Sequence, residues 1–282
     1  MRDSKYMKLA IKLGQKGACY VNANPMVGAV IVAPEGRIIG EGWHRMCGSA
    51  HAEVNAIASV SDPELLKDST IYVTLEPCSH YGKTPPCSQL IIDKGLPRVV
   101  VGSLDPYEKV SGRGVKMLRD AGIEVTTGVL EEECRAVNPV FMTAHSLRRP
   151  WVTLKWAQSA DGYIDRLRDP SQPPAQLSTP LTATLMHRQR TMHDAIMAGS
   201  GTVISDNPSL TSRLWPGRNP NRVIMSRHNS IPADCLLLTD GLPVTVSRSG
   251  SVAKELERLY AEGTTSVLVE GGAKLLQSFI DA

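Results

Sequence analysis

Two stretches of this sequence, His51-Ala52-Glu53 and Pro77-Cys78-Ser79-His80-Tyr81-Gly82-Lys83-Thr84-Pro85-Pro86-Cys87, carry its strongest chemical signal. A neutral imidazole and two thiolates form the ligand set of a catalytic zinc whose fourth position holds water. The two thiolate charges also offset the charge of Zn²⁺. We therefore predict a zinc held by the histidine and the two cysteines, with Glu53 as the proton carrier.

Each part of this pattern has an ordinary explanation when it is taken alone. A His-x-Glu at the start of a helix is usually a capping or surface feature, and two cysteines in a loop can be unrelated thiols. Here the prolines stiffen the loop and place Cys87 near the start of a helix, where the helix dipole favours a thiolate. Together these features favour His51, Cys78 and Cys87 as metal ligands. A structural zinc would need a fourth protein ligand, for which Cys47 and His80 are the nearby candidates.

The composition bounds the class of protein. A chain of 282 residues is too long for one typical core and suits two domains of ordinary size. Its net charge of +3 comes from interspersed acidic and basic residues, without the basic stripe that a nucleic-acid footprint needs. Residues 1–17 lack an uninterrupted apolar core, so neither a signal peptide nor a membrane span is indicated, and we predict a cytoplasmic protein. Six scattered cysteines do not form a disulfide framework, which favours metal binding or catalysis for the paired ones.

The first half of the chain alternates between strand and helix patterns, which predicts an α/β domain with a substantially parallel sheet. Asp3 or Ser4 can cap a first helix that runs to about Lys16. The apolar run at 27–32 predicts a buried strand, and residues 37–42 its hairpin partner. We expect further strands at 70–75, 98–102 and 123–129, and helices from His51, at 86–94 and at 114–121.

A second series of strands and helices follows a change of pattern between about residues 140 and 150, where Arg148-Arg149-Pro150 interrupts the chain. We expect strands at 151–156, 194–198, 222–226, 235–238, 244–247 and 266–270, and helices at 181–192 and 252–262. Residues 169–180 are rich in Pro, Ser and Gln and predict a loop over a site or an exposed connection.

The second half has no G-x-G-x-x-G fingerprint, so a Rossmann dinucleotide site cannot be predicted from it. It does have Val269-Glu270-Gly271-Gly272-Ala273 at a strand-to-helix junction. Missing side chains there would let a phosphate approach backbone N–H groups at the helix start. A tight turn is the commoner explanation of two adjacent glycines, so both interpretations remain open.

The two zinc stretches, read as H-A-E-V-N and P-C-S-H-Y-G-K-T-P-P-C, resemble the deaminase half of the bifunctional riboflavin-biosynthesis deaminase/reductase family. The pattern H-x-E followed by P-C-x-x-C is the signature of zinc deaminases, in which the metal activates water and the carboxylate shuttles protons. A longer insert separates the cysteines here, unlike in cytidine or tRNA deaminases. Residues 155–162, 199–203, 206–213 and the Glu-Gly-Gly turn occur in the order seen in the family's reductase half.

This resemblance implies a cytidine-deaminase-like three-layer α/β/α domain at residues 1–145 and a dihydrofolate-reductase-like α/β domain at 150–282. It implies Zn²⁺ and NADPH as cofactors and small phosphorylated pyrimidines as substrates. The first domain would replace the ring amino group of a pyrimidinone ribosylamine phosphate, made from GTP, with oxygen. The second would reduce the resulting ribosylamino uracil phosphate to the ribitylamino compound. Because the two sites act in series, we also expect a homo-oligomer, and neither a nucleic acid nor a membrane as partner.

The resemblance also assigns site residues position by position. Around the zinc it implies substrate contacts from Asn24, His44, His80, Lys83 and Thr84, although Lys83 could instead be a solvated surface lysine. It implies cofactor contacts from Ala157, Thr202, Asp206, Gly271 and Gly272. It implies substrate contacts in the second domain from Arg190, Leu210, Arg213 and Glu270. Asp206 is the predicted catalytic polar group of the reduction, and a turn residue before Asn207-Pro208 is the alternative.

Two departures from the family pattern concern the second domain. Residues 175–179 read Ala-Gln-Leu-Ser-Thr where the family usually has Ser-x-Trp-Ile-Thr, so those contacts are not carried over. The sequence stops at Phe279-Ile280-Asp281-Ala282, inside the helix after the Gly-Gly turn, so we expect a reductase domain without its C-terminal end. The alternatives are a deaminase with an inactive reductase half and a non-catalytic zinc-binding module. A nucleic-acid deaminase is disfavoured by the charge and by the long cysteine insert.

Overall fold

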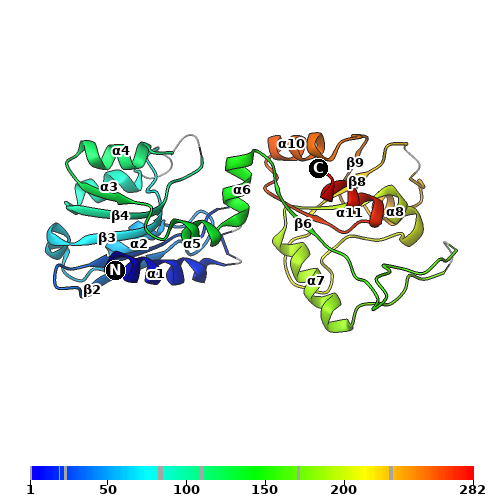
Figure 1. Cartoon of the computed structure of the whole chain (residues 1–282), viewed down its shortest axis with the longest axis horizontal. Coiled ribbons are helices and arrows are strands. Elements are labelled where there is room, and N and C mark those ends of the chain that lie inside the picture. Colours follow the sequence, from blue (N-terminus) through cyan, green and yellow to red (C-terminus); the bar gives the residue numbers. More distant parts are fainter. Residues whose placement is uncertain are drawn as a thin grey trace. The chain divides into compact units, whose positions relative to one another are not determined.

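The computed structural model describes residues 2–18, 20–21, 24–81, 85–107, 111–169, 172–228 and 231–282. The chain folds as two compact units, Met1–Ser146 and Leu147–Ala282. Each unit is built around one five-stranded sheet (Figure 1). Every helix in the described part of the chain is too short or too polar to cross a bilayer.

The sheet of the first unit is mixed, with the strand order β2-β1-β3-β4-β5. Its strands are β1 Gly28–Val32, β2 Ile38–Trp43, β3 Thr70–Leu75, β4 Arg98–Ser103 and β5 Glu124–Thr127. The predicted hairpin between β1 and β2 is confirmed. The strands β3, β4 and β5 are parallel, whereas β1 is antiparallel to β3 as well as to β2. The helix between β2 and β3 carries the chain back across the sheet, so both strands run in the same direction on either side of β1.

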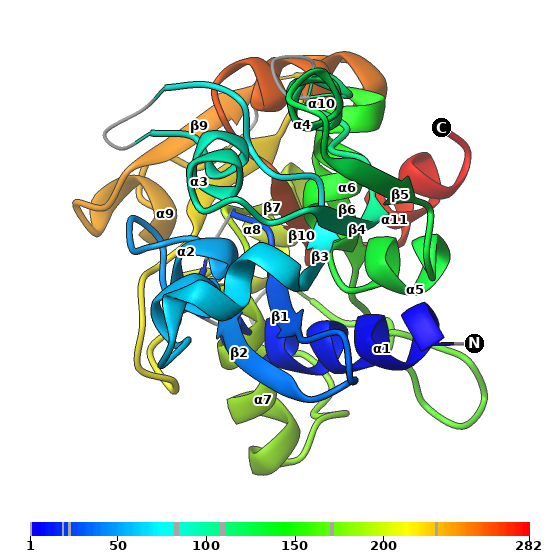
Figure 2. The same cartoon turned by 90° about the vertical axis from the view of Figure 1, so that its left-hand side faces the viewer.

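Helices cover both faces of this sheet. They are α1 Arg2–Gly14, α2 Ala52–Ala58, α3 Cys87–Asp93, α4 Arg113–Asp120, α5 Glu131–Ala136 and α6 Pro139–Leu147, with short 3-10 turns at Gln15–Gly17 and Pro63–Asp68. One apolar cluster joins the sheet to α2, α3 and α4, and a second joins its other face to α1 and α5 (Figure 2). The unit is therefore the three-layer α/β/α sandwich that the alternating pattern predicts.

Two details of the first unit differ from the prediction or refine it. Helix α1 begins at Arg2, and Asp3 does not cap it: the Asp3 carboxylate accepts hydrogen bonds from Arg98 and from the hydroxyl of Tyr72. Helix α2 lies directly against β2, and this approach requires a glycine at position 42. A Cβ on Gly42 would come within 2.3 Å of the carbonyl oxygen of Ala52. This close approach fixes the start of the helix that follows the zinc histidine.

The sheet of the second unit is entirely parallel, with the strand order β6-β10-β7-β8-β9. Its strands are β6 Trp151–Leu154, β7 Ala195–Gly199, β8 Asn221–Met225, β9 Val244–Ser247 and β10 Ser266–Val269. Its helices are α7 Pro180–Met192, α8 Ser200–Asp206, α9 Leu236–Thr239, α10 Val252–Ala261 and α11 Ala273–Ile280. Apolar residues of α10 and α11 cover one face of the sheet, and those of α8 and α9 cover the other. A parallel sheet with helices on both faces is buried on both sides, as its central strands are here.

The strand predicted at 235–238 is wrong. Cys235 is the residue before α9, and a single helical turn follows it. Leu237 is buried between the exposed Leu236 and Leu238, so one helical turn imitates the alternation of a strand. The region 169–180 has no regular structure among its described residues until α7 begins at Pro180, as predicted.

Candidate active sites

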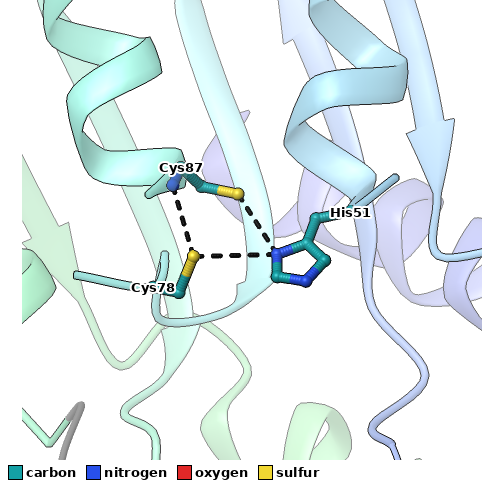
Figure 3. A group of neighbouring side chains, drawn as sticks. All are labelled: His51, Cys78 and Cys87. Carbon is teal, nitrogen blue, oxygen red and sulfur yellow. Dashed lines mark hydrogen bonds between the residues drawn. The ribbon is translucent and has the colours of Figure 1, made fainter. Parts of the chain in front are cut away.

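The three predicted zinc ligands converge in the first unit (Figure 3). His51 immediately precedes α2, Cys78 lies in the loop after β3, and Cys87 is the first residue of α3. Their ligating atoms all lie within 4.8 Å of one another. Both sulfurs face Nδ1 of His51, at 3.7 Å from Sγ of Cys78 and 3.3 Å from Sγ of Cys87. One imidazole nitrogen and two sulfurs in this arrangement fit a zinc ion.

A fourth protein ligand is absent from this group within the described part of the chain. Cys47 lies elsewhere and accepts a hydrogen bond of 3.4 Å from the amide of Asn24. His80 lies on the wall of the adjacent cavity. Three protein ligands match a catalytic zinc, which keeps one position for water or substrate, and not a closed structural site.

The start of α3 stabilises negative charge on Cys78, which lies in the preceding loop. The backbone N–H of Cys87 donates to Sγ of Cys78 at 3.2 Å. Hydrogen bonds from the Cys87 thiol and from His51 lower the pKa of Cys78 to about 4. The same contact with Cys78, together with burial, raises the pKa of Cys87. The hydrogen bond to Cys78 also raises the pKa of His51.

Glu53 lies in the first turn of α2 and faces the cavity beside the ligands. Only 3% of the residue is exposed, and this burial raises the pKa of Glu53 to about 7. A carboxyl group with a pKa close to neutrality can both accept and return a proton. The predicted proton carrier thus lies in the position and in the environment that this role needs.

The cavity next to the zinc ligands has a volume of about 330 Å³. The predicted substrate residues Asn24, His44 and His80 all line it. The ring of His44 lies 5.6 Å from that of His51 and is held through a 3.2 Å contact with the carbonyl oxygen of Ala50. Burial lowers the pKa of His44, which favours its neutral form. The other two predicted residues, Lys83 and Thr84, lie outside the described residues.

Several cavity residues were not found from the sequence: Glu76, Asp105, Tyr107, Phe141 and His145. Glu76 is 3% exposed, and its carboxylate accepts three backbone N–H groups, from Asp105, Gly112 and Val115. It thereby ties the end of β3 to the loop after β4 and to the start of α4. Burial raises the pKa of Asp105 to about 6. The position of Glu76 directly before Pro77-Cys78 was the one signal that could have identified it.

The second unit has a larger cavity, of about 950 Å³, at the carboxyl ends of β7, β8 and β9 and at the starts of α8, α10 and α11. The predicted cofactor residues Thr202 and Gly272 line it, and the backbone N–H of Gly272 donates to the hydroxyl of Thr202 at 2.9 Å. Serine hydroxyls and the cationic side chains of Arg227 and Lys274 line the same wall. Hydroxyls, helix starts and cations together fit the phosphates of a dinucleotide.

The other residues predicted in the second unit do not line this cavity. Asp206, at the end of α8, pairs with Arg168. Gly271 lies one residue before the cavity wall, where a Cβ would come within 2.7 Å of the Leu275 side chain. Ala157 lies outside regular structure after β6.

The four predicted substrate residues of the second unit form a separate group around Arg190. This guanidinium binds both oxygens of Glu270, each at 2.8 Å, and donates to the carbonyl oxygen of Thr211 at 2.7 Å. Arg213 binds the hydroxyl of Ser209 at 2.9 Å, and Leu210 is buried with a positive φ of 51°. Arg190 therefore joins the end of β10 to the segment 209–213.

The first unit has the fold and the metal-ligand geometry of a zinc-dependent deaminase, and it is joined to an α/β unit with a dinucleotide-sized cavity. Comparisons with known proteins agree with this class. Residues 1–103 match the family described as cytidine and deoxycytidylate deaminase zinc-binding region, and residues 150–282 match the RibD C-terminal domain. The chain belongs to the RibD family of riboflavin biosynthesis proteins.

Individual relatives support this assignment over nearly the whole chain. The riboflavin biosynthesis protein RibD of Aquifex aeolicus is 41% identical over 270 residues, which are 95% of this chain and 74% of the relative. That of Bacillus amyloliquefaciens is 39% identical over 307 aligned residues, covering 99% of this chain and 81% of the relative. The crystal structure of a diaminohydroxyphosphoribosylaminopyrimidine deaminase/5-amino-6-(5-phosphoribosylamino)uracil reductase from Thermotoga maritima is 41% identical, with a TM-score of 0.82. The match covers 99% of this chain and 84% of that one.

Family membership confirms the predicted fold class, the two enzymatic activities and their place in riboflavin biosynthesis. It also confirms the two cofactors, Zn²⁺ for the deaminase domain and NADPH for the reductase domain, and the residues present fit both groups. The substrates of the RibD family are small phosphorylated pyrimidines.

Proposed function

We propose that the first unit deaminates a pyrimidinone ribosylamine phosphate beside His51, Cys78 and Cys87, and that the second unit reduces the ribosyl group of the product with NADPH. The observation that carries this proposal is the convergence of those three ligands within 4.8 Å, with the buried Glu53 on the wall of the same cavity. The domain limits that we propose are 1–145 for deamination and 150–282 for reduction.

Glu53 is the proton carrier in the proposed deamination. When bound, zinc lowers the pKa of a water molecule and so supplies the nucleophile. Glu53 would accept one proton of the attacking water and pass it to the ring nitrogen, and would then take the second proton of that water and pass it to the amino group, which leaves as ammonia while the ring carbon keeps the oxygen. Its burial supports this role, since a pKa of about 7 lets the carboxyl group work in both directions near neutral pH.

The substrate base occupies the cavity of about 330 Å³ in this proposal. Asn24, His44 and His80 on its wall provide the polar contacts. Lys83 and Thr84 are proposed to bind the substrate phosphate, and the charge of a lysine suits a phosphate group.

For the reduction, NADPH is assigned to the cavity of about 950 Å³, with Thr202 and Gly272 on its wall. Gly271 precedes Gly272 in the proposed phosphate-binding turn. The reducible sugar is assigned to the group formed by Arg190, Leu210, Arg213 and Glu270. Asp206 and Ala157 keep their proposed cofactor contacts, and Asp206 its catalytic role. The pairing of Asp206 with Arg168 favours the alternative, in which Asp206 holds the segment after β6. Association of several copies and a cytoplasmic location remain predictions.

A coupled assay on the purified chain tests the proposal. We expect one zinc per chain by metal analysis, ammonia release from the diaminopyrimidine ribosylamine phosphate without NADPH, and NADPH oxidation only after that step. Absence of ammonia release from the zinc-loaded protein would refute the deaminase assignment. Ammonia release without saturable NADPH binding would favour the alternative, a deaminase whose reductase half is inactive.

A further inference from the structure

Asn138, in the short link between α5 and α6, makes an unusual contact with a distant part of the first unit. Its Oδ1 accepts the backbone N–H of Met26 at 2.6 Å, and its Nδ2 donates to the carbonyl oxygen of Met26 at 2.9 Å. The two residues are 112 positions apart, and Asn138 is 5% exposed. One side chain therefore satisfies both backbone groups of one residue, as a neighbouring strand does in a hydrogen-bonded pair.

The two segments joined by this contact both contribute to the wall of the deaminase cavity. Asn24, Pro25 and Val27, which flank Met26, all line the cavity. The carbonyl oxygen of Val27 also accepts the backbone N–H of His44 at 2.9 Å, so the contact extends to a second cavity residue.

Helix α6, which begins directly after Asn138, supplies a second part of the wall. Phe141 and His145 lie three and seven positions beyond Asn138, on one face of the helix, and both line the cavity. Their rings are 4.6 Å apart. Asn138 itself does not line the cavity and does not contact the zinc ligands or Glu53 in the structure.

We infer that Asn138 is a positioning residue of the deaminase, which sets the separation of the segment 24–27 from helix α6 and thereby the affinity for the pyrimidine substrate. This inference rests on the proposed deaminase function. The zinc ligands and Glu53 lie at the start of α2, at the start of α3 and in the loop after β3, whereas the side chain of Asn138 hydrogen-bonds to Met26. Loss of Asn138 should therefore weaken substrate binding more than it slows the chemical step.

The test compares Asn138→Ala and Asn138→Asp with the wild-type chain. Alanine removes both hydrogen bonds, whereas aspartate keeps the acceptor for the Met26 N–H and places a second oxygen against the Met26 carbonyl. Asn219→Ala is the matched control, because Asn219 also accepts a backbone N–H, from Ser212 in the second unit at 2.8 Å. Zinc content, thermal unfolding, kcat and KM for ammonia release are measured for each. Substrate affinity is also measured by calorimetry in the Glu53→Gln background.

We expect both Asn138 variants to keep one zinc per chain and to raise KM and the dissociation constant about tenfold, with kcat changed less than about threefold. The Asn219→Ala control should leave both deaminase constants unchanged. A lower unfolding temperature with unchanged KM in the Asn138 variants would overturn the inference, because it would reduce Asn138 to a structural role. A fall in kcat at constant KM would overturn it as well. If the wild-type chain itself releases no ammonia, the proposed function has failed and not the role of Asn138.

Discussion

The two candidate sites are built in opposite ways. In the first unit, polar side chains face a cavity of about 330 Å³, and Glu53, His44 and Asp105 are buried around it. In the second unit, glycines, hydroxyls and the cationic side chains of Arg227 and Lys274 line a cavity of about 950 Å³, while Arg190 and Glu270 bind each other outside it. The first arrangement suits chemistry on a small planar base, because its groups are positioned before the substrate arrives. The second suits binding of a large anion, where the protein has little chemistry to perform.

The segments around the two sites are also held by opposite charges. In the first unit, Glu76 accepts backbone N–H groups at the start of α4. In the second unit, Arg222 donates to the backbone carbonyls of Ser209, Leu237, Leu242 and Pro243 and pairs with Asp240. An anion matches the unpaired N–H groups of a helix start, and a guanidinium matches a loop whose carbonyls point inward. Each unit therefore contains one buried charge whose removal should disturb its own site and leave the other intact.

The largest effect is expected for Glu53→Gln. Deamination should fall by about 10²–10⁴-fold, since glutamine preserves the shape of the residue but cannot carry a proton. Zinc content and NADPH-dependent reduction of the separately supplied uracil intermediate should be unchanged. Glu64→Gln, which alters an exposed carboxylate on a 3-10 turn, is the matched control. Unaltered ammonia release from the Glu53 variant would show that the proton carrier has been misassigned.

Arg222→Met should have the next largest effect, on stability and not on chemistry. The side chain of Arg222 is 1% exposed, and its removal leaves Asp240 and several carbonyls without their donor. We expect the second unit to lose about 2–3 kcal/mol in its free energy of unfolding, because buried carbonyl oxygens lose a charged hydrogen-bond donor. Denaturant titration should show the unfolding transition of the second unit shifting while deamination persists. Arg218→Met, at a pair in which the arginine is 51% exposed, should cost at most about 1 kcal/mol.

The deaminase site could be predicted well from the sequence, because its ligands are chemically distinctive and their order is informative. His51, Cys78 and Cys87 needed only their residue types and a strand at 70–75 to place the loop. Most strands were predicted for a similar reason: β3 and β9 are bounded by turn residues and have clear apolar runs. Signals that are local in sequence were sufficient for these features.

Features that depend on long-range contacts could not be predicted. Phe141 and His145 belong to helix α6, which we did not predict although Asn138-Pro139 is a helix start signal, and no local signal shows that this helix reaches the cavity. Asn138 binds a residue 112 positions away. The antiparallel pairing of β1 with β3 follows from the path of the chain over the sheet, which no local pattern specifies. The short helix α9 was mistaken for a strand because one turn contains too few residues to reveal its period.

Glu270→Gln tests whether the paired charges of the second unit matter as a pair. The side chains of Arg190 and Glu270 are 12% and 9% exposed and are joined by two hydrogen bonds. Glutamine has only one oxygen, so it can accept only one of them. We expect the second unit to lose about 2 kcal/mol in stability, the value for one charge-assisted hydrogen bond, and the reductase KM for its sugar substrate to rise about tenfold. Glu262→Gln, at an exposed carboxylate of the same unit, is the control. Normal reductase kinetics in the Glu270 variant would remove this pair from the proposed substrate site.

The smallest effect concerns acid stability and again separates the two units. Asp194, before β7, accepts hydrogen bonds from Thr265 and Ser266 at the start of β10 and from Arg218. Burial would raise its pKa, but the hydrogen bonds from Thr265 and Arg218 hold the pKa of Asp194 below its ordinary value of 3.8. The unfolded chain therefore binds a proton more readily than the folded one. The stabilisation is fully present above that ordinary value and is lost as the pH falls through the lower folded-state pKa.

Asp194→Asn should accordingly weaken the second unit by about 1–2 kcal/mol at neutral pH and by less at low pH, where the wild-type carboxylate is also protonated. Unfolding titrations between pH 7 and about pH 2 would show the two stability curves converging below the ordinary pKa of 3.8. The exposed Asp234→Asn variant should follow the wild-type curve throughout. A gap between wild type and Asp194→Asn that stays constant with pH would mean that the carboxylate acts here through its shape and not through its charge. The first unit, whose site depends on no contact with Asp194, should keep its deaminase activity in this variant.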